Sequence, residues 1–519
     1  METSSNYEKR WLVLGVMCIV LFIISIDNTV LNLALPSISN GLGATASQLQ
    51  WIVDAYTLIF ASLLITTGTI GDRFGRKRLL LLGLALFGAG SLGAALSVST
   101  PMLIGFRALL GMAGAMVMPS TLSILIDVFR DVKERARAIA IWSSIFSIGA
   151  GIGPIIGGFL INSFNWSSVF YLNLPIVATG LIGGYLLAPE SKDAHAPRPD
   201  FPGVTLSITG LIALVYGMIQ AGENGWTARV VLLSFGLAFV FLAAFIWWEN
   251  HSPNPMLPLV FFKNMAFTGA NAALTISAFA MMGSMYFFSQ FFQSVQGYTP
   301  LIAALCMLPM TPFVFASTML SVRVDRKMGT KFTMSLGLLF SGLGLFLFSQ
   351  VASIDTPYGY ILIVLGLLGS GIGFTMSPAT NSVMNSLPPS RAGIGSAMND
   401  TTRQLGGALG IAVLGALMNG TYRAGVDHLK GLDGLSETAL ELIRNSLQSA
   451  HLSAHNLEAS LASLVVQTSS QAFVDGMKEA LFIGSIAMVV AAIAAWIILP
   501  DKDKSQEIAT MQAVQDGHR

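Results

Sequence analysis

Charged side chains are scarce in this sequence. Asp, Glu, Lys and Arg together make up 11% of 519 residues, whereas hydrophobic residues make up 53%. Soluble domains carry about a quarter charged residues. The formal net charge of +1 also excludes the strongly basic surface that binds nucleic acid. The composition therefore predicts a protein that contacts membrane lipid and has no nucleic-acid partner.

Cysteine and histidine are scarce too. Both cysteines, Cys18 and Cys306, lie in apolar stretches, so we expect buried thiols rather than a disulfide. The six histidines lie in loops and tails, mainly His428, His451 and His455, without metal-ligand spacing, and we expect them to be solvated. The sequence has no phosphate-binding loop for ATP and no catalytic cluster. We therefore expect no enzyme, no cofactor and no metal, and any uphill transport must use an ion gradient.

Long apolar stretches are abundant. A helix needs about 20 apolar residues to cross a bilayer, and we count fourteen such stretches. They cover roughly residues 11–34, 48–70, 79–98, 101–126, 137–161, 165–187, 203–221, 229–248, 266–293, 301–321, 332–350, 357–380, 393–418 and 478–499. The first is too long for a cleaved signal peptide. The pattern predicts an all-α polytopic membrane protein whose two termini lie on the same side.

The distribution of Lys and Arg predicts the orientation. The short loops around 36–47, 99–100, 162–164, 294–300 and 351–356 contain no Lys or Arg. The loops on the opposite side and the two termini are basic, and only Arg229, at a helix edge, breaks the pattern. Basic loops stay in the cytoplasm. We therefore expect a multi-pass protein of the cytoplasmic membrane with both termini inside.

Two segments are too polar to span the membrane. Residues 188–200 form a Pro-rich linker, which is a candidate boundary between two halves. Residues 419–476 form a long extracytoplasmic loop, and helical spacing within 436–448 predicts short amphipathic helices there. This loop could cap the outer mouth, lie on the membrane surface, or be a solvated hairpin without a direct role.

A weak internal repeat divides the chain. The segment 323–331 resembles the glycine-punctuated basic turn Gly68–Arg78, and each follows the second span of a six-span block. We therefore expect two six-helix bundles, at residues 1–187 and 266–500, separated by a linker and two inserted helices (188–265) and followed by a cytoplasmic tail (501–519). Two parallel repeats around a central site are typical of transporters.

Five charged residues lie deep in the predicted spans, away from their ends: Asp27, Asp54, Arg107, Asp400 and Arg403. Such residues are costly and usually functional. A buried carboxylate is easily protonated, whereas a nearby Arg opposes protonation, so we predict that these five couple transport to protons. Three alternatives remain: an Asp27–Arg107 ion pair that only holds helices in register, an exposed Asp54 without a role, and an Asp400–Arg403 pair that satisfies itself.

Two glycine-containing regions are predicted to control conformation. In the fifth span, the small residues and the proline permit close helix approach and a kink, although mere packing is the alternative. These residues are Gly149, Gly153, Pro154, Gly157 and Gly158. The two basic turns are predicted to form a latch at the inner gate, with a topology anchor as the alternative. Their residues are Gly68, Asp72, Arg73, Gly75 and Arg76 in the first copy and Asp325 and Arg326 in the second.

Substrate contacts are predicted from aromatic, Met and amide residues in the ninth span, because such surfaces adapt to many ligands. An ordinary apolar membrane helix is the alternative. The ninth-span residues are Met282, Met285, Tyr286, Phe287, Gln290 and Gln293, and Asn28, Trp51 and Tyr56 from the first two spans complete the predicted set.

These motifs together resemble the major facilitator superfamily. Gly68–Arg78 is similar to its signature loop, and residues 107–114 to the span-four motif of proton-coupled members, whose Arg is implicated in proton transfer. Gly149–Gly158 resembles the antiporter motif found in exporters. Residues 27–36 are similar to the first-span motif of the fourteen-span drug:proton antiporters. The resemblance covers nearly the whole chain.

The resemblance implies the major facilitator fold and proton-coupled efflux of amphipathic cationic or neutral drugs and biocides by a monomer. The alternative is a dedicated exporter of one metabolite, antibiotic or lipid. An uptake symporter and a non-transporting membrane sensor or enzyme are disfavoured by the antiporter motif and by the lack of a catalytic cluster. Three features depart from the family pattern: Ser321 before the second basic turn, Asn399–Asp400 where relatives carry paired acids, and the long outer loop.

Overall fold

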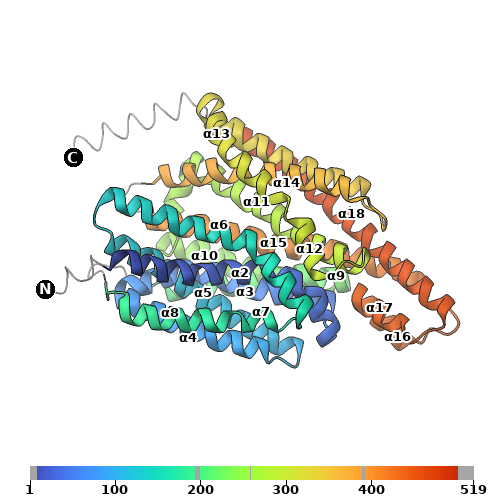
Figure 1. Cartoon of the computed structure of the whole chain (residues 1–519). Helices are drawn as coiled ribbons and strands as arrows, with labels where there is room; N and C mark the ends of the chain where they lie inside the picture. Colours follow the sequence, from blue (N-terminus) through green and yellow to red (C-terminus); the bar gives the residue numbers. More distant parts are fainter. Residues whose placement is uncertain (1–8, 193–198, 258, 388–391, 501–519) are drawn as a thin grey trace. The chain divides into compact units, whose positions relative to one another are not determined.

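The computed structural model describes residues 9–192, 199–257, 259–387 and 392–500, and these residues contain helices and no strand (Figure 1). The expected tail 501–519 and part of the linker lie outside the described residues. The membrane-length helices of the first part of the chain are α2 (Arg10–Leu42), α3 (Ala46–Phe74), α4 (Arg76–Ala95), α5 (Thr100–Val128), α6 (Val132–Ser163), α8 (Asn173–Leu187) after the short α7 (Ser168–Tyr171), α9 (Phe201–Asn224) and α10 (Arg229–His251).

The second part begins with the short helix η1 (Leu259–Lys263). It continues with α11 (Met265–Gln290) and its continuation η2 (Phe291–Val295), the short α12 (Pro300–Met307), and the long helices α13 (Met310–Val351), α14 (Tyr358–Asn385), α15 (Ala392–Val426) and α18 (Ala459–Ile498). Between α15 and α18 lie η4 (Asp427–Leu429), α16 (Glu437–Asn445) and α17 (Leu447–Ala454). The predicted all-α polytopic architecture is confirmed.

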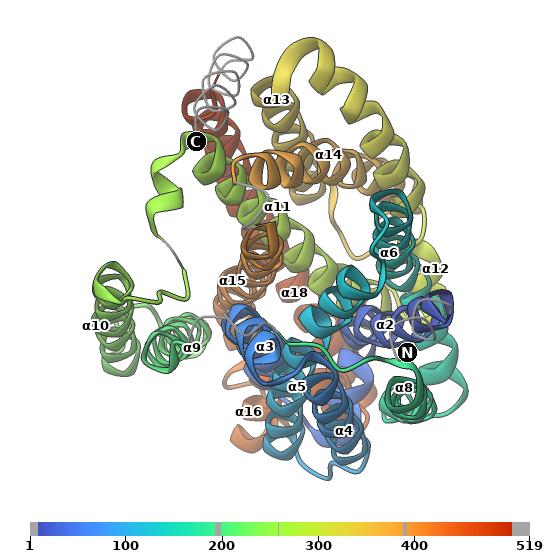
Figure 2. The ribbon, with the colours of Figure 1, turned by 90° about the vertical axis from the view of Figure 1, so that its left-hand side faces the viewer.

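Thirteen helical stretches among the described residues are long and apolar enough to cross a membrane. One of them, Pro300–Val351, has 52 residues, more than twice the length that one span needs. Gly329 interrupts it with φ 85° and ψ 162°, a conformation that side-chain-bearing residues rarely adopt. The bend in α13 is visible in Figure 2. The expected spans 301–321 and 332–350 lie on either side of this break.

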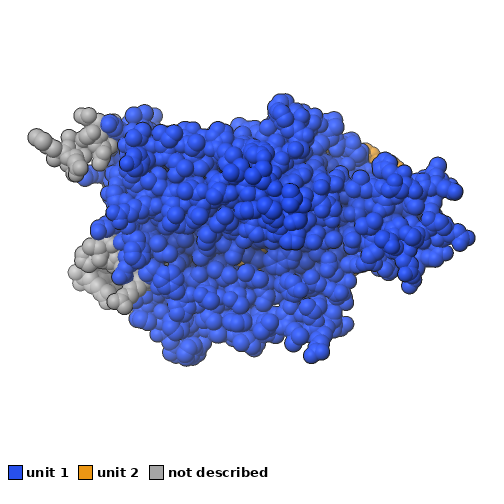
Figure 3. All heavy atoms as spheres, turned by 90° about the horizontal axis from the view of Figure 1, so that it is seen from below, with its two compact units in different colours: residues 1–257, 285–308, 411–476 blue, residues 258–284, 309–410, 477–519 orange. Residues whose placement is uncertain are grey.

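Contacts group the chain into two compact units, which Figure 3 distinguishes by colour. Unit 1 comprises residues 1–257, 285–308 and 411–476, and unit 2 comprises residues 258–284, 309–410 and 477–519. Three of the five unit boundaries fall within α11, α15 and α18, and the other two fall between helices, before η1 and between α12 and α13. They differ from the boundaries expected for two six-helix bundles, which stay a prediction.

Within unit 1, small residues allow helices to pack closely. Gly111 of α5 lies against the backbone of Tyr56 on α3, where a Cβ would overlap the carbonyl group. The helices α9 and α10 pack on each other where Gly210 meets Leu242. Within unit 2, α13 and α14 approach similarly, and Gly371 lies against Ser341 and the backbone of Gly337. Backbone contact of this kind is typical of membrane helices, which lack a hydrophobic driving force for association.

The amphipathic helices predicted within residues 436–448 are confirmed as α16 and the start of α17. Leu440 and Ile443 of α16 are buried, and the hydroxyl of Tyr422 on α15 donates to the Ile443 carbonyl at 2.8 Å. Ser446 caps α17 and lies 3.4 Å from the Ser39 hydroxyl on α2. The segment is therefore docked on unit 1 rather than being a free hairpin.

Candidate functional site

The buried ion pair in unit 1 joins Asp27 of α2 to Arg107 of α5. An Arg107 guanidinium nitrogen (Nη1) lies 2.6 Å from Asp27 Oδ2, and the two residues are 6% and 1% exposed. Arg107 Nε donates to the Ile52 carbonyl of α3 at 3.0 Å, and its guanidinium lies 4.3 Å from the centre of the Tyr56 ring. Arg107 thus connects three helices.

Polar side chains complete the surroundings of this pair. Asn173, at the start of α8, donates to Asp27 Oδ1 at 3.3 Å and to the Ser91 hydroxyl of α4 at 3.0 Å. Asn28 donates to the Tyr56 hydroxyl at 3.3 Å. Both carboxylate oxygens of Asp27 therefore accept a hydrogen bond. The predicted ion-pair alternative describes this geometry, and a proton-coupling role for the pair stays a prediction.

Asp54 has the opposite surroundings. It is completely buried, and neither of its carboxyl oxygens has a hydrogen-bond partner among the described residues. Gln50, one helical turn earlier on α3, leaves its amide nitrogen without a partner, and Tyr286 likewise leaves its hydroxyl without one. Asp54 lies near enough to Tyr286 for an electrostatic interaction. The alternative of an exposed Asp54 without a role is therefore wrong, and the burial of Asp54 favours the predicted functional role, which stays a prediction.

Helical periodicity explains why the two carboxyls differ. Ile52 and Tyr56 are four residues apart on α3 and share the face that meets Arg107. Gln50 and Asp54 are also four residues apart, but their face is turned roughly halfway around the helix from the first. One helix therefore separates a paired charge from an unpaired carboxyl.

The glycines of the fifth-span motif lie where α6 packs on α2, the helix that carries Asp27. A side chain at Gly149, Gly153 or Gly157 would overlap Ser25, Thr29 or Val30, respectively. Gly158 faces the start of α12 instead. Pro154 lies inside α6, which continues through it. The motif therefore brings the backbone of α6 against the residues on either side of Asp27.

The basic turn Gly68–Arg78 joins α3 to α4. Asp72 and Arg76 form an ion pair at 2.8 Å across the turn, and Gly75 between them has φ 121°. Gly68 and Gly71 lie against α5 and α4, and Arg73 is exposed. Two linker residues also dock here: Glu190 Oε1 accepts from Lys77 N at 3.2 Å, and the Ser191 carbonyl accepts from Arg76 N at 3.0 Å.

Comparison with known proteins identifies the family. The model of the Major Facilitator Superfamily matches residues 17–411, well over half of the chain. The chain belongs to the major facilitator superfamily.

Two relatives and one solved structure illustrate this membership. The multidrug efflux pump LfrA of Mycolicibacterium smegmatis is 34% identical over 491 residues, which cover 95% of this chain and 96% of LfrA. The multidrug resistance protein Stp of Mycobacterium tuberculosis is 31% identical, covering 95% of this chain and 94% of Stp. A bacterial homologue of the human lysosomal transporter Spinster, crystallised inward-facing and unoccupied, superposes with a TM-score of 0.63. At 17% identity, covering 95% and 99% of the two chains, this likeness shows the fold alone.

The remaining predicted proton-coupling residues of this superfamily member lie in unit 2. Asp400 and Arg403 are neighbours on one face of α15, with Asp400 Oδ1 3.9 Å from an Arg403 guanidinium nitrogen. Their side chains are 20% and 31% exposed, respectively. The distance agrees with the alternative of mutual neutralisation, and a proton-coupling role stays a prediction.

The second basic turn also lies in unit 2, within α13. Asp325 and Arg326 precede the break at Gly329, so the chain reverses at the place where the repeat predicts a turn. Asp325 Oδ1 is buried and has no hydrogen-bond partner among the described residues. Lys331 lies 5.1 Å from the ring of Trp496. In the second turn, Gly329 supplies the positive φ that Gly75 supplies in the first.

The predicted substrate residues are divided between the units. In unit 2, Met282 packs on Gly407. In unit 1, Tyr286 and Phe287 are buried, Met285 is partly buried, and Gln290 Nε2 lies 3.5 Å from the Tyr286 carbonyl. Gln293 donates to the Leu33 carbonyl of α2 at 3.0 Å. Trp51 packs instead against Tyr216 of α9, with ring centres 6.2 Å apart.

Our sequence reading missed three polar contacts. The first is Asn173 beside Asp27, although an amide near the start of an apolar stretch was a usable signal. The second is Glu190, which no local pattern marks. The third is a buried carboxyl pair where the start of α9 meets the end of α10: Asp200 accepts from the Trp248 indole at 2.8 Å, and Glu249, 3% exposed, accepts from Leu257 N at 2.8 Å.

Proposed function

We propose that this protein is a drug:proton antiporter of the fourteen-span branch, which exports amphipathic cationic or neutral drugs and biocides across the cytoplasmic membrane. The names of LfrA and Stp support multidrug efflux. We further propose that the protein works as a monomer with both termini in the cytoplasm, and that its helices form two six-helix bundles with α9 and α10 inserted between them.

The contrast between Asp27 and Asp54 carries this proposal. Burying an isolated carboxylate is costly, so Asp54 holds a proton or a cation when this conformation is populated. A cationic substrate that reaches Asp54 would displace the proton, and a proton that reaches it would displace the substrate. If the proton and the cationic substrate cannot occupy Asp54 at the same time, their competition is the simplest basis for exchanging one for the other.

Asp27 has a different part in the proposed cycle. While it is ionised, its bond to Arg107 holds α2, α5 and α3 together in the present arrangement. A proton arriving at Asp27 from the outer side removes the charge that attracts Arg107 and so loosens the joint. Protonation then shifts the balance between conformations by the difference in proton affinity between them. Asp400 and Arg403 are the proposed second proton-coupling pair, in unit 2.

We assign gating, rather than substrate choice, to the basic turns and to the glycines of α6. The Asp72–Arg76 ion pair holds the end of α3 against the start of α4, and Glu190 holds the linker on the same turn. Neutralising Asp72 is expected to change the transport rate and leave the order of preferred drugs unchanged. A shifted drug preference at an unaltered rate would contradict this assignment.

Transport by purified protein in liposomes tests the proposed function. With an imposed pH step, a fluorescent quaternary-ammonium dye should move against the direction of proton flow, and an uncoupler should abolish the movement. Dye movement in the same direction as protons would indicate an uptake symporter. A panel of dyes, biocides and antibiotics decides the range, since activity toward a single compound would favour the dedicated exporter.

A further inference from the structure

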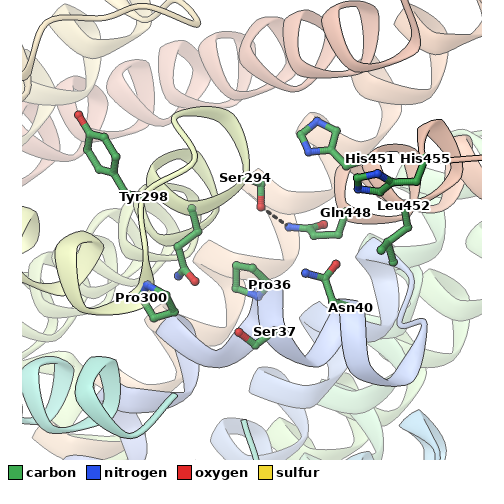
Figure 4. Close-up of a pocket in the computed structure, with 11 residues that line it drawn as sticks. Pro36, Ser37, Asn40, Ser294, Tyr298, Pro300, Gln448, His451, Leu452 and His455 are labelled. Carbon is green, nitrogen blue, oxygen red and sulfur yellow. Dashed lines mark hydrogen bonds between the residues drawn. The ribbon is translucent and has the colours of Figure 1, made fainter. Parts of the chain in front are cut away.

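A polar cavity of about 310 Å³ lies in unit 1 beneath α17 (Figure 4). Its walls come from the end of α2, from η2 and the chain that leads to the start of α12, and from one face of α17 with the residue that caps it. None of its lining residues is Asp, Glu, Lys or Arg. The chemistry of the cavity comes from amides, hydroxyls and two imidazoles, His451 and His455.

The two histidines are four residues apart and lie on one face of a helix. Our sequence reading did not count this spacing as a metal pattern. His451 lies in α17, and His455 follows it with φ −61° and ψ −21°, so the helical spacing continues through both. Residues at this spacing are neighbours on the helix surface, and both rings line the same cavity. Two His at this spacing on one helix face can ligate zinc together.

His451 is held in position by a neighbouring helix. Its Nε2 lies 3.3 Å from the Ser470 hydroxyl of α18. When Nε2–H donates to Ser470, the lone pair lies on Nδ1, as in metal-binding histidines whose second nitrogen is tied by a hydrogen bond. Burial, aided by the nearby His455, lowers the pKa of His451. His451 is therefore half-buried and bonded, and the expectation that it is solvated is wrong, whereas His455 is exposed as expected.

Gln448 precedes His451 by one helical turn on α17 and adds an oxygen atom to the lining of the cavity. It is 4% exposed, and its amide nitrogen donates to the Ser294 hydroxyl at 2.8 Å. Its carbonyl oxygen has no hydrogen-bond partner among the described residues. A buried acceptor of this kind requires a donor, a cation or a water bound to a cation. The cavity therefore offers two imidazoles and one amide oxygen.

We propose that His451 and His455 form a binding site for a divalent transition metal of the zinc class in the cavity beneath α17. Imidazole suits Zn²⁺, Cu²⁺ and Ni²⁺, whereas Ca²⁺ and Mg²⁺ require oxygen ligands, typically carboxylates. Across the described residues, no three or more His, Cys, Asp or Glu side chains could hold a metal together. The site is therefore open and exchangeable, with water completing the coordination, rather than a closed structural centre. The proposed function enters this inference at one point only: the proposed membrane orientation places the cavity on the outer side.

Calorimetric titration of purified protein that carries no polyhistidine tag tests the site. Wild type should bind one equivalent of ZnCl₂ at pH 7.5 and should show no comparable heat with MgCl₂. His451→Gln and His455→Gln should each weaken zinc binding at least tenfold. The matched control is His428→Gln, because His428 lies in the same loop but does not line the cavity, and its zinc affinity should equal that of wild type.

A register control separates the metal site from general effects of sequence change. The double variant His455→Asn with Asn456→His keeps the composition and moves one imidazole off the shared face, so zinc affinity should stay low. Thermal unfolding in detergent without metal verifies that each variant is folded. Equal zinc affinity in wild type and in the His451 and His455 variants would overturn the proposal. Since the titration requires neither drug nor gradient, its failure is distinct from failure of the proposed export.

Discussion

Asp27 and Asp54 are buried carboxyls in the same unit, and they differ in what surrounds them. Asp27 has a guanidinium and an amide within hydrogen-bond distance, whereas both oxygens of Asp54 lack partners. A satisfied buried charge stabilises a particular helix arrangement, and an unsatisfied group is available to a ligand. The difference indicates that holding the structure and exchanging ligands are assigned to separate carboxyls, and variants at each should show separable defects.

The largest effect is expected for Asp27→Asn. This change leaves the Arg107 charge buried without a counter-charge, which costs on the order of 3–5 kcal/mol. We expect a marked loss of stability in detergent and loss of gradient-driven export in inverted vesicles. The double variant Asp27→Asn with Arg107→Met should recover much of the stability but none of the coupling. Full gradient-driven export by Asp27→Asn would refute the proton-coupling role of Asp27.

Asp54→Asn should lower function without lowering stability. No hydrogen bond of the carboxyl is lost, so the free energy of unfolding should stay equal or rise. Export of cationic substrates should fall by at least tenfold, and export of neutral substrates should fall less. Parallel dye and neutral-drug assays, together with thermal unfolding, measure the three quantities. A stability loss as large as that of Asp27→Asn would remove the distinction between the two carboxyls.

Asn173→Ala is expected to have an intermediate effect on stability. It removes one hydrogen bond to the ionised Asp27 and one to Ser91, and bonds to charged groups contribute about 1.5–3 kcal/mol. Coupled export should persist at a reduced rate, because Arg107 still neutralises Asp27. Ser91→Ala serves as a control, since it removes only the weaker of the two contacts. An Asn173 variant that is as stable as wild type would contradict a positioning role.

Tyr286→Phe should have the smallest effect on stability. The hydroxyl that it removes has no hydrogen-bond partner among the described residues. The free energy of unfolding should therefore change by less than about 0.5 kcal/mol. Tyr422→Phe is the contrasting control, because that hydroxyl donates to the Ile443 carbonyl and its loss should destabilise the outer loop. Equal destabilisation by the two changes would show that Tyr286 has an interaction we have not identified.

The sequence predicted the elements of the fold well, because apolar length and basic loops reflect local chemistry. The helices, the break near the second basic turn and the amphipathic helices α16 and α17 all follow from patterns within about 20 residues. The site was predicted less completely. The five intramembrane charges were found, but which carboxyl is paired depends on helix neighbours. Asp27 and Arg107 are 80 residues apart, and no spacing rule places them together.

Helical spacing alone could have predicted that Asp54 lies on a different face of its helix from the residues that contact Arg107. The four-residue steps from Gln50 to Asp54 and from Ile52 to Tyr56 already imply two opposite faces of one helix. In contrast, Glu190 reaches Lys77 across 113 residues, and the orientation of His451 depends on a hydroxyl of α18. Contacts of this kind arise only once the chain is packed.

The hydrogen bond between Ser191 and the first turn of α4 limits the distance between that turn and the start of α9. From Ser191 to Asp200, which precedes α9, the chain has nine peptide links, so their separation cannot exceed about 30 Å. While the hydrogen bond from Arg76 to Ser191 holds, the start of α9 therefore cannot lie farther from the basic turn than these nine peptide links allow. Movement of the turn changes the position from which this distance is measured. Release of Ser191 increases the largest distance that is possible, because more residues then join the two.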